Sequence, residues 1–400
     1  MIRRAAMAVV ALLALGSATS PATTYLVRPD GTGDFATIPE AVEAAASGDS
    51  VVLADGVYML SRTIDYDGKD IVLCSASGDP TTCTIVPHSG GEGVVITHVP
   101  TDAAILRGVT IQGGATAVVT GASSPVIRDC VFRDNQTTSG AGIYCGTGSP
   151  LIVNCLFEGN VAMGPFGSGI PGWGGGICVV EGSPRIVDCT FTGNLAGGVG
   201  GAVYASGGST TLVNCRITGG GIDGVYCTGG TLDISDCIIT GNLGCGVSCH
   251  ECTCTIIGST IASNDNHHPG GGLRVGGGGA VHAERCVIWG NCSTVGAAEV
   301  FVDVGCVAEF ACCIVDSAGV EGDGSITGLG PNSYEDPLFC DPVPCSMEPT
   351  DSGDYSVSEA SPCTPENSAC GALIGALPAA CPGQPAAEQT TWGAIKAMFR

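Results

Sequence analysis

One phrase recurs along the middle of this chain and constrains its fold more than any other feature. It runs PVIRDCVFRDN from Pro125, PLIVNCLFEGN from Pro150 and PRIVDCTFTGN from Pro184. Weaker copies follow, and the central positions of successive copies are Cys130, Cys155, Cys189, Cys215, Cys237, Ser259, Cys286 and Cys312. Their separations of 22 to 34 residues indicate a solenoid, because one such unit cannot bury its apolar face alone, whereas stacked units can.

Each copy has the pattern of short strands. An aliphatic residue, the central cysteine and a Phe or Ile occupy relative positions −3, 0 and +2, and the last two follow the two-residue period of a strand. Glycine and Asx turns separate these strands, without any segment of helical period. A leucine-rich repeat would show regularly spaced leucines, and a propeller would need blades of about 40 residues. The sequence therefore predicts an all-β solenoid, a right-handed parallel β-helix with coils about 4.8 Å apart.

Stacked coils imply columns of like residues. We expect the central cysteines to point inward as small apolar thiols, with disulfides as the alternative. Beside them should stack Phe132, Phe157, Phe191, Ile217, Ile239, Ile261 and Ile288. A third column is expected to be a structural ladder, because asparagine tolerates left-handed backbone and bonds its neighbours in turns. It comprises Asn135, Asn160, Asn194, Asn242, Asn264 and Asn291.

The N-terminal region contains two separate signals. Met1–Ala22 has the charges Arg3 and Arg4 before a short apolar run, which predicts a secretory signal peptide. Thr37 and Glu40 form a capping box with a proline early in the helix. The following apolar stripe and the strand Ser50–Leu53 predict a short capping helix that closes the open end of the solenoid.

The charge balance restricts the possible partners. The formal net charge is -24, and it becomes more negative when Arg3 and Arg4 are removed with the signal peptide. Such a surface argues against nucleic acid and anionic membranes as partners, and it makes polyuronates harder to attract. No later apolar run is long enough to span a bilayer.

The opening YLVRPDGTGDFATIPEAVEAA from Tyr25, with Ala54–Tyr58, resembles the start of pectin-lyase-like β-helix proteins, which pectin methylesterases share. With the repeats, the resemblance covers Tyr25 to Cys381, and it is greatest to bacterial secreted right-handed parallel β-helix repeat proteins. It implies a secreted, extracellular or cell-surface location on a bacterium. The expected organisation is a signal peptide (1–22), a cap with the first coils (23–93), repeats (94–316), a closing segment (317–381) and a linker with a short amphipathic tail (382–400).

The cysteines outside the repeat column suggest disulfides. Three close pairs lie in loop-like sequence and are the predicted bridges: Cys74 with Cys83, Cys340 with Cys345, and Cys363 with Cys370. Cys381 stays unassigned. A cluster of Cys245, Cys249, Cys252 and Cys254 with His250 has spacing unlike a zinc site, so we expect disulfides or core thiols there instead of a metal.

The sequence shows no obvious set of catalytic residues for any of the reactions that are usual on this fold. A polyuronate lyase needs a base and a cation that neutralises the uronate carboxylate, yet the two lysines, Lys69 and Lys396, flank the repeats and the arginines form no column. The paired aspartates of pectin hydrolases and pectin methylesterases are missing. A column one residue before the central cysteine comprises Asp129, Asn154, Asp188, Asn214 and Asp236. It fits turn bonding better than catalysis, with weak Ca²⁺ binding as an alternative, and no other cofactor is expected.

Two surface features remain as candidate ligand contacts. Two coils, which are separated by four coil steps, carry an insertion just after the asparagine column. One insertion contains Trp173, and the other contains His267 and His268. The outward column of the Gly-aliphatic-x strand contains Tyr144, Tyr204, Tyr226 and Arg274. Aligned aromatics could stack on sugar rings, although tyrosine also suits strands and stacks on its neighbours.

These observations favour a non-enzymatic secreted or surface protein that binds glycans or partner surfaces. The alternative is a polysaccharide lyase or hydrolase acting on pectin-like or other acidic glycans, with its residues spread over several coils.

Overall fold

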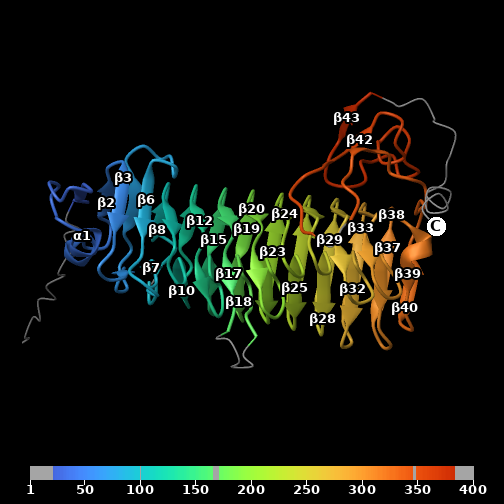
Figure 1. Cartoon of the computed structure of the whole chain (residues 1–400), viewed down its shortest axis with the longest axis horizontal. Coiled ribbons are helices and arrows are strands. Elements are labelled where there is room, and N and C mark those ends of the chain that lie inside the picture. Colours follow the sequence, from blue (N-terminus) through green and yellow to red (C-terminus); the bar gives the residue numbers. More distant parts are fainter. Residues whose placement is uncertain (1–20, 100, 165–170, 346–347, 383–400) are drawn as a thin grey trace, which may run out of the picture.

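The computed structural model describes residues 21–99, 101–164, 171–345 and 348–382. The predicted signal peptide up to residue 20, residues 165–170 of the first insertion and the predicted tail from residue 383 lie outside the described residues. The described chain is a long solenoid of parallel strands, so the predicted fold class is confirmed (Figure 1). No helix in the described part is long and apolar enough to cross a membrane.

Three parallel sheets run along the solenoid, and successive coils add strands to each of them. Sheet A has 13 strands: β1 (Thr24–Val27), β2 (Ser50–Leu53), β5 (Val72–Ser75), β8 (Ile105–Arg107), β11 (Val126–Arg128), β15 (Leu151–Val153), β19 (Arg185–Val187), β23 (Ser209–Val213), β26 (Thr231–Ser235), β29 (Thr253–Ile257), β33 (Ala280–Glu284), β37 (Val307–Ala311) and β40 (Ser325–Gly328).

Sheets B and C have 11 strands each. Sheet B contains β3 (Gly56–Met59), β6 (Cys83–Val86), β9 (Thr110–Gln112), β12 (Val131–Arg133), β16 (Leu156–Glu158), β20 (Thr190–Thr192), β24 (Arg216–Thr218), β27 (Ile238–Thr240), β30 (Thr260–Ala262), β34 (Val287–Trp289) and β38 (Ile314–Val315). Sheet C contains β4 (Ile64–Asp65), β7 (Val94–Val95), β10 (Val118–Gly121), β14 (Ile143–Cys145), β18 (Ile177–Val180), β22 (Val203–Ser206), β25 (Val225–Thr228), β28 (Val247–His250), β32 (Leu273–Gly276), β36 (Val300–Val302) and β39 (Val320–Glu321).

The predicted columns of the core are confirmed. Phe132, Phe157 and Phe191 are fully buried and pair in register, and their ring centroids lie 5.1 and 4.6 Å apart. The isoleucines of the next coils continue this column. The central cysteines beside them are free buried thiols, and their Sγ atoms donate to main-chain carbonyls such as that of Val153 from Cys155. Close packing of like residues in successive coils therefore forms the core.

One position of the cysteine column was assigned wrongly. The inward thiol of the last coil is Cys313, which is fully buried and accepts a hydrogen bond from the Cys286 N–H. Cys312 lies one residue earlier, in the left-handed position with φ 60°, and forms a disulfide with Cys370. A shift of one residue moves a side chain to the opposite side of a strand, so of two adjacent cysteines only one can join the column.

The asparagine column is a hydrogen-bonded ladder inside the solenoid. Asn135 Nδ2 donates to Asn160 Oδ1 and Asn160 Nδ2 to Asn194 Oδ1, both at 3.0 Å. A second run joins Asn242, Asn264 and Asn291 and ends where Asn291 Nδ2 donates to the Glu299 carboxylate at 2.6 Å. The structural prediction is confirmed, but its conformational reason was wrong: the left-handed residues are the ones before the asparagines, such as Asp134 and Gly159.

The column one residue before the central cysteine has a turn role, as predicted. Its five members have φ between 50° and 55°, the left-handed region that Asp and Asn tolerate. Asn154 Nδ2 donates to Asp129 Oδ1 at 2.8 Å, and Asn214 Nδ2 donates to Asp188 Oδ1 at 2.7 Å. These side chains therefore bond one turn to the next.

The N-terminal end is closed as predicted. Helix α1 (Ile38–Ala44) begins after Thr37, whose side chain accepts from the Glu40 N–H while the Glu40 carboxylate accepts from the Thr37 N–H. Its apolar stripe, including Ala41 and Val42, is buried against the first coils. The predicted strand Ser50–Leu53 is β2.

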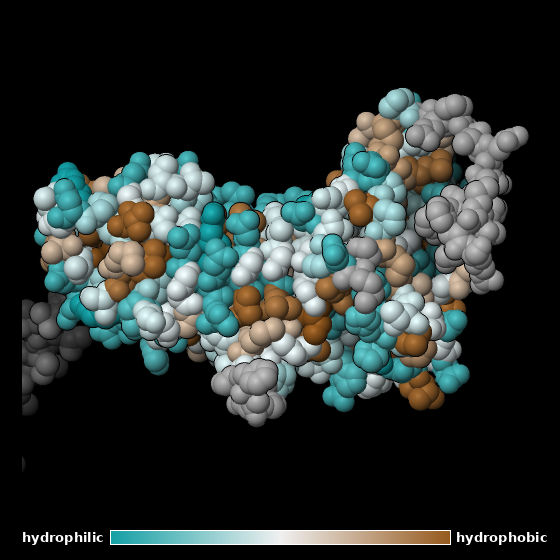
Figure 2. All heavy atoms as spheres, viewed as in Figure 1, coloured by the Kyte–Doolittle hydropathy of each residue, from teal (hydrophilic) through white to brown (hydrophobic). Residues whose placement is uncertain are grey.

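The closing segment returns over the outer side of sheet B. The closing segment rises above the last coils in Figure 1. In Figure 2, the middle coils beside this segment form a lower part of the outline. Val357, Cys363 and Ile374 pack there against Val287 and Ile314. A small sheet of β41 (Phe339–Asp341), β42 (Asp354–Ser358) and β43 (Ala379–Cys381) organises this segment.

The predicted disulfides were wrong. Cys74, Cys83 and Cys363 are buried free thiols; Cys74 and Cys83 lie in strands β5 and β6 and not in loops as expected, and Cys363 lies in the apolar cluster under the closing segment. The other three predicted cysteines pair with distant partners, because the closing segment folds back on the solenoid. The bridges are Cys249–Cys252, Cys292–Cys345, Cys312–Cys370 and Cys340–Cys381, with Cα atoms 5.7 to 6.1 Å apart.

Candidate functional site

The outward side chains of sheet C form one column along the solenoid. Tyr144, Cys178, Tyr204 and Tyr226 are in register in successive coils. Ser248, Arg274 and Phe301 follow in the next three coils. Parallel pairing in register places each side chain directly beside its counterpart in the next coil, so the alignment predicted for Tyr144, Tyr204, Tyr226 and Arg274 is present in the structure.

Trp173 joins this column from the turn before β18. Its main chain bridges to Ser139 and Val199, and its ring stacks on Tyr204 with centroids 6.0 Å apart. Tyr204 stacks in turn on Tyr226, again at 6.0 Å, with the planes 11° apart. In the coil of Trp173 the strand position itself holds the small Cys178. The insertion therefore supplies the aromatic ring that the strand lacks, and two features that are separate in the sequence form one surface.

We call Tyr144, Trp173, Tyr204 and Tyr226 the aromatic ladder. The rings of its last three members stack, so that their faces are turned toward one another. Each stacked pair contributes about 0.5–1.5 kcal/mol beyond its buried area. Trp173 is 36% exposed, and the tyrosines are partly buried. The result is a rigid strip over four coils, about 14 Å long at the usual strand spacing.

Arg274 and Phe301 extend the strip toward the C-terminal end. The Arg274 guanidinium lies over the Phe301 ring, 6.0 Å from its centroid, an arrangement that a cation–π interaction favours. Arg274 Nη2 also lies 3.9 Å from Asp303 Oδ2, with both side chains about one third exposed. This salt bridge is screened by water and contributes little to stability, but it brings a carboxylate to the edge of the strip.

Asp223 lies in the turn just before β25, the strand that carries Tyr226. Its Oδ1 accepts the Cys245 N–H at 2.8 Å. Burial raises the pKa of Asp223 to about 6, although the Cys245 hydrogen bond and the Arg274 charge both act in the opposite direction. Burial also raises the pKa of Tyr226, and the negative charge of Asp223 adds to that effect. Nothing in the sequence pattern marks Asp223, because its counterparts in the neighbouring coils, Gly201 and Cys245, are not acidic.

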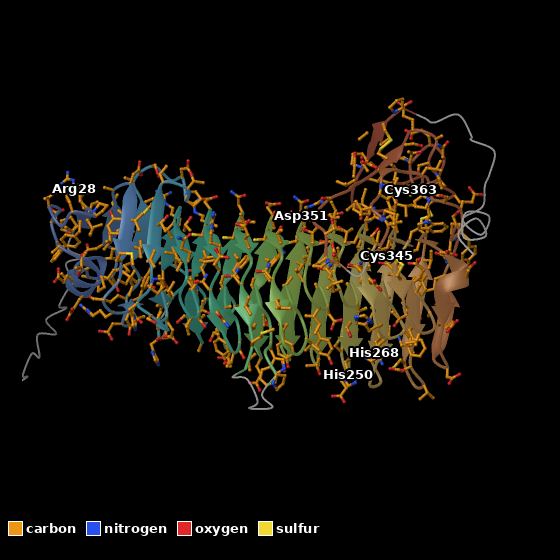
Figure 3. All side chains as sticks on the ribbon, in the orientation of Figure 1. Arg28, His250, His268, Cys345, Asp351 and Cys363 are labelled. Carbon is orange, nitrogen blue, oxygen red and sulfur yellow. A yellow bond between two sulfur atoms is a disulfide. The ribbon has the colours of Figure 1, made fainter. Side chains whose placement is uncertain are left out.

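His267 and His268 lie in the second insertion, in the turn before β32. Both are exposed, and their main-chain carbonyls accept from Thr294 and Ser293, which holds the second insertion against the next coil. The chain then returns at Gly270, where an added Cβ would lie 3.1 Å from Phe301 Cβ and 3.2 Å from Arg274 Cβ. His250 and His268 lie on the side of the solenoid away from the closing segment (Figure 3).

Other chemistry that the sequence suggested has a structural explanation. In the cysteine-rich turn, Cys249 and Cys252 form a disulfide, whereas Cys245 and Cys254 are buried thiols. Among the described residues, no group of three His, Cys, Asp or Glu side chains is placed to hold a metal ion. Asp129 and Asp188 border a shallow hollow with Pro80, but both carboxylates accept turn hydrogen bonds.

Comparison with known proteins identifies the family. The family described as "Right handed beta helix region" matches residues 55–207 and 200–322, about two thirds of the chain. This chain belongs to that right-handed β-helix family. A search of curated proteins finds no match to it.

Solved structures of this fold resemble the β-helix protein at low identity. The pectate lyase Pel9A is 16% identical over 71% of this chain and 78% of the lyase, with a TM-score of 0.49. A PL6 alginate lyase in complex with a trisaccharide is 10% identical over 92% and 97%, with a TM-score of 0.45. A rhamnogalacturonan lyase is 14% identical over 80% and 90%, with a TM-score of 0.37.

Proposed function

We propose that this β-helix protein is an extracellular, non-enzymatic protein that binds glycan chains along the aromatic ladder. The observation that carries the proposal is the placement of Trp173. A residue from a turn insertion completes a row of tyrosines on the strands, and it does so on the outside of the solenoid, where core packing does not require an aromatic ring.

The chemistry of the ladder suits a sugar chain. Tyr and Trp present an apolar ring edge together with a hydrogen-bonding tip, which is why they are common in binding surfaces. Because the rings are held by each other and by strands, binding would cost little side-chain entropy. Asp223 and Arg274 at the end of the ladder can accept from and donate to sugar hydroxyls.

The disulfides support the proposed extracellular location. The four disulfides in the described part of the chain are compatible with an oxidising compartment. Two of them, Cys292–Cys345 and Cys312–Cys370, join the closing segment to the solenoid. Because that segment covers sheet B, it leaves the aromatic ladder on sheet C open.

The test is a binding measurement with ladder variants. The protein is titrated with a panel of neutral oligosaccharides and polyuronate oligosaccharides by calorimetry. We expect Trp173→Ala and the double variant Tyr204→Ala/Tyr226→Ala to weaken binding by about tenfold or more, as central aromatic contacts do. Tyr334→Ala is the matched control, because Tyr334 is 63% exposed and lies outside the ladder in the closing segment.

Two results would contradict the proposal. Unchanged affinity in the ladder variants, with thermal midpoints near that of the wild type, would exclude the ladder as the binding site. Unsaturated products or new reducing ends after incubation of the wild type with the same glycans would show a lyase or a hydrolase instead.

A further inference from the structure

Negative charge borders the C-terminal half of the ladder. Asp223 and Glu251 both influence Tyr226 electrostatically, and Arg274 opposes them. Asp303 lies at the Arg274 guanidinium. Glu321 pairs in register with Phe301 and so follows it in the same outward column. Four carboxylates thus border this part of the strip, which has Arg274 as its one guanidinium among these residues.

Arg274 does not provide a free positive site. Its guanidinium lies over Phe301 and 3.9 Å from Asp303 Oδ2, and it also interacts electrostatically with Asp223. A uronate carboxylate placed here would compete with two carboxylates of the protein for one cation. It would also approach a chain with a formal net charge of -24. Like charges at short range weaken binding and slow association, most strongly at low salt.

We propose that the ladder takes neutral glycans and rejects polyuronates. The inference rests on the proposed function, and it names the substrate class of the same site. Hydroxyl groups of a neutral sugar can donate to Asp223 and Asp303 and accept from Arg274 without adding charge. A uronate ring of the same shape carries one carboxylate per sugar into this negative border.

The experiment compares two ligands that differ only in their carboxyl groups. Oligogalacturonate and the same oligosaccharide after carboxyl reduction share ring size and linkage, so a difference in affinity reports charge. In 20 mM salt we expect the reduced ligand to bind about tenfold more tightly. Raising the salt to 300 mM should strengthen oligogalacturonate binding and leave the reduced ligand nearly unaffected.

Charge variants separate this inference from ladder binding itself. Glu251→Gln with Asp303→Asn removes two negative charges from the border and should shift the affinity ratio toward oligogalacturonate. Glu335→Gln with Asp341→Asn removes two exposed charges from the closing segment and should leave the ratio unchanged.

Each outcome has a distinct meaning. Tighter binding of oligogalacturonate at 20 mM salt, or a ratio that both charge variants leave unchanged, overturns the preference for neutral glycans. Binding of the reduced ligand that Tyr204→Ala/Tyr226→Ala does not weaken overturns the ladder as the site, and with it the neutral preference assigned to that site.

Discussion

Glu299 ends the second run of the asparagine ladder, and its replacement by glutamine should stabilise the last coils at neutral pH. The side chain is only 2% exposed. Its carboxylate accepts the Asn291 main-chain N–H and Asn291 Nδ2, with Oε2 2.6 Å from Nδ2. Burial, the largest cause, raises the pKa of Glu299 from 4.5 to about 7, even though these hydrogen bonds favour the ionised form. The charge of Asp316 also raises it.

The direction of the effect follows from proton binding. Between pH 4.5 and 7 the folded protein keeps a proton on Glu299 that the unfolded chain has lost, so stability falls as the pH rises through this window. The shift corresponds to about 3 kcal/mol. A glutamine at this position would keep an oxygen that can accept from Asn291, and it has no charge to desolvate. We therefore expect Glu299→Gln and the wild type to have similar stability at pH 4.5, and the variant to be more stable by about 3 kcal/mol at pH 8.

Hydrogen exchange is the suitable assay, because a solenoid can open locally at one end before the whole molecule unfolds. Protection of β36 to β38 would be measured from pH 4.5 to 8, with rates corrected for intrinsic exchange. Glu335→Gln is the control, since Glu335 is an exposed carboxylate of the closing segment. If the difference in protection between Glu299→Gln and the wild type stays constant over this pH range, the reasoning is refuted.

Three further predictions concern the core and the closing segment. Phe157→Ala should lower the free energy of unfolding by about 3–5 kcal/mol, measured by denaturant titration, because Phe157 is fully buried between the rings of Phe132 and Phe191. The double variant Cys312→Ser/Cys370→Ser removes a disulfide with a sequence separation of 58. The loss should destabilise docking of the closing segment by about 4 kcal/mol, and limited proteolysis should then cleave this segment faster than in the wild type. The free thiols in the described residues should resist iodoacetamide until the protein is denatured, because they are buried and burial raises the pKa of Cys145 to about 11.

The sequence predicted the solenoid well because each coil repeats the same packing problem. A parallel ladder places residue i of one coil beside its counterpart in the next, so a column that is visible in the sequence is also a column in space. The phenylalanines, asparagines and outward tyrosines were all found in this way. The capping helix was found from local rules, since a capping box depends only on nearby residues.

The disulfides could not be found in this way. Cys340 and Cys345 are close in sequence, yet each pairs with a distant cysteine, Cys381 and Cys292 respectively. The closing segment has no repeat, and its path back over the solenoid depends on tertiary contacts. Its local sequence pattern does not predict that path. The same holds for Cys312, whose neighbour Cys313 is an equally good cysteine for the core.

The position of Trp173 could be predicted from the sequence repeat only in part. The repeat identifies Cys178 as the small residue in a column of tyrosines, and it marks the long turn before Cys178 as an insertion. It does not say that Trp173, near the end of that turn, stacks on Tyr204. In this solenoid, the strands supply a regular spacing of outward positions and an insertion changes what one position presents. Surface chemistry can therefore vary at the turns while the buried columns, on which stability depends, stay constant.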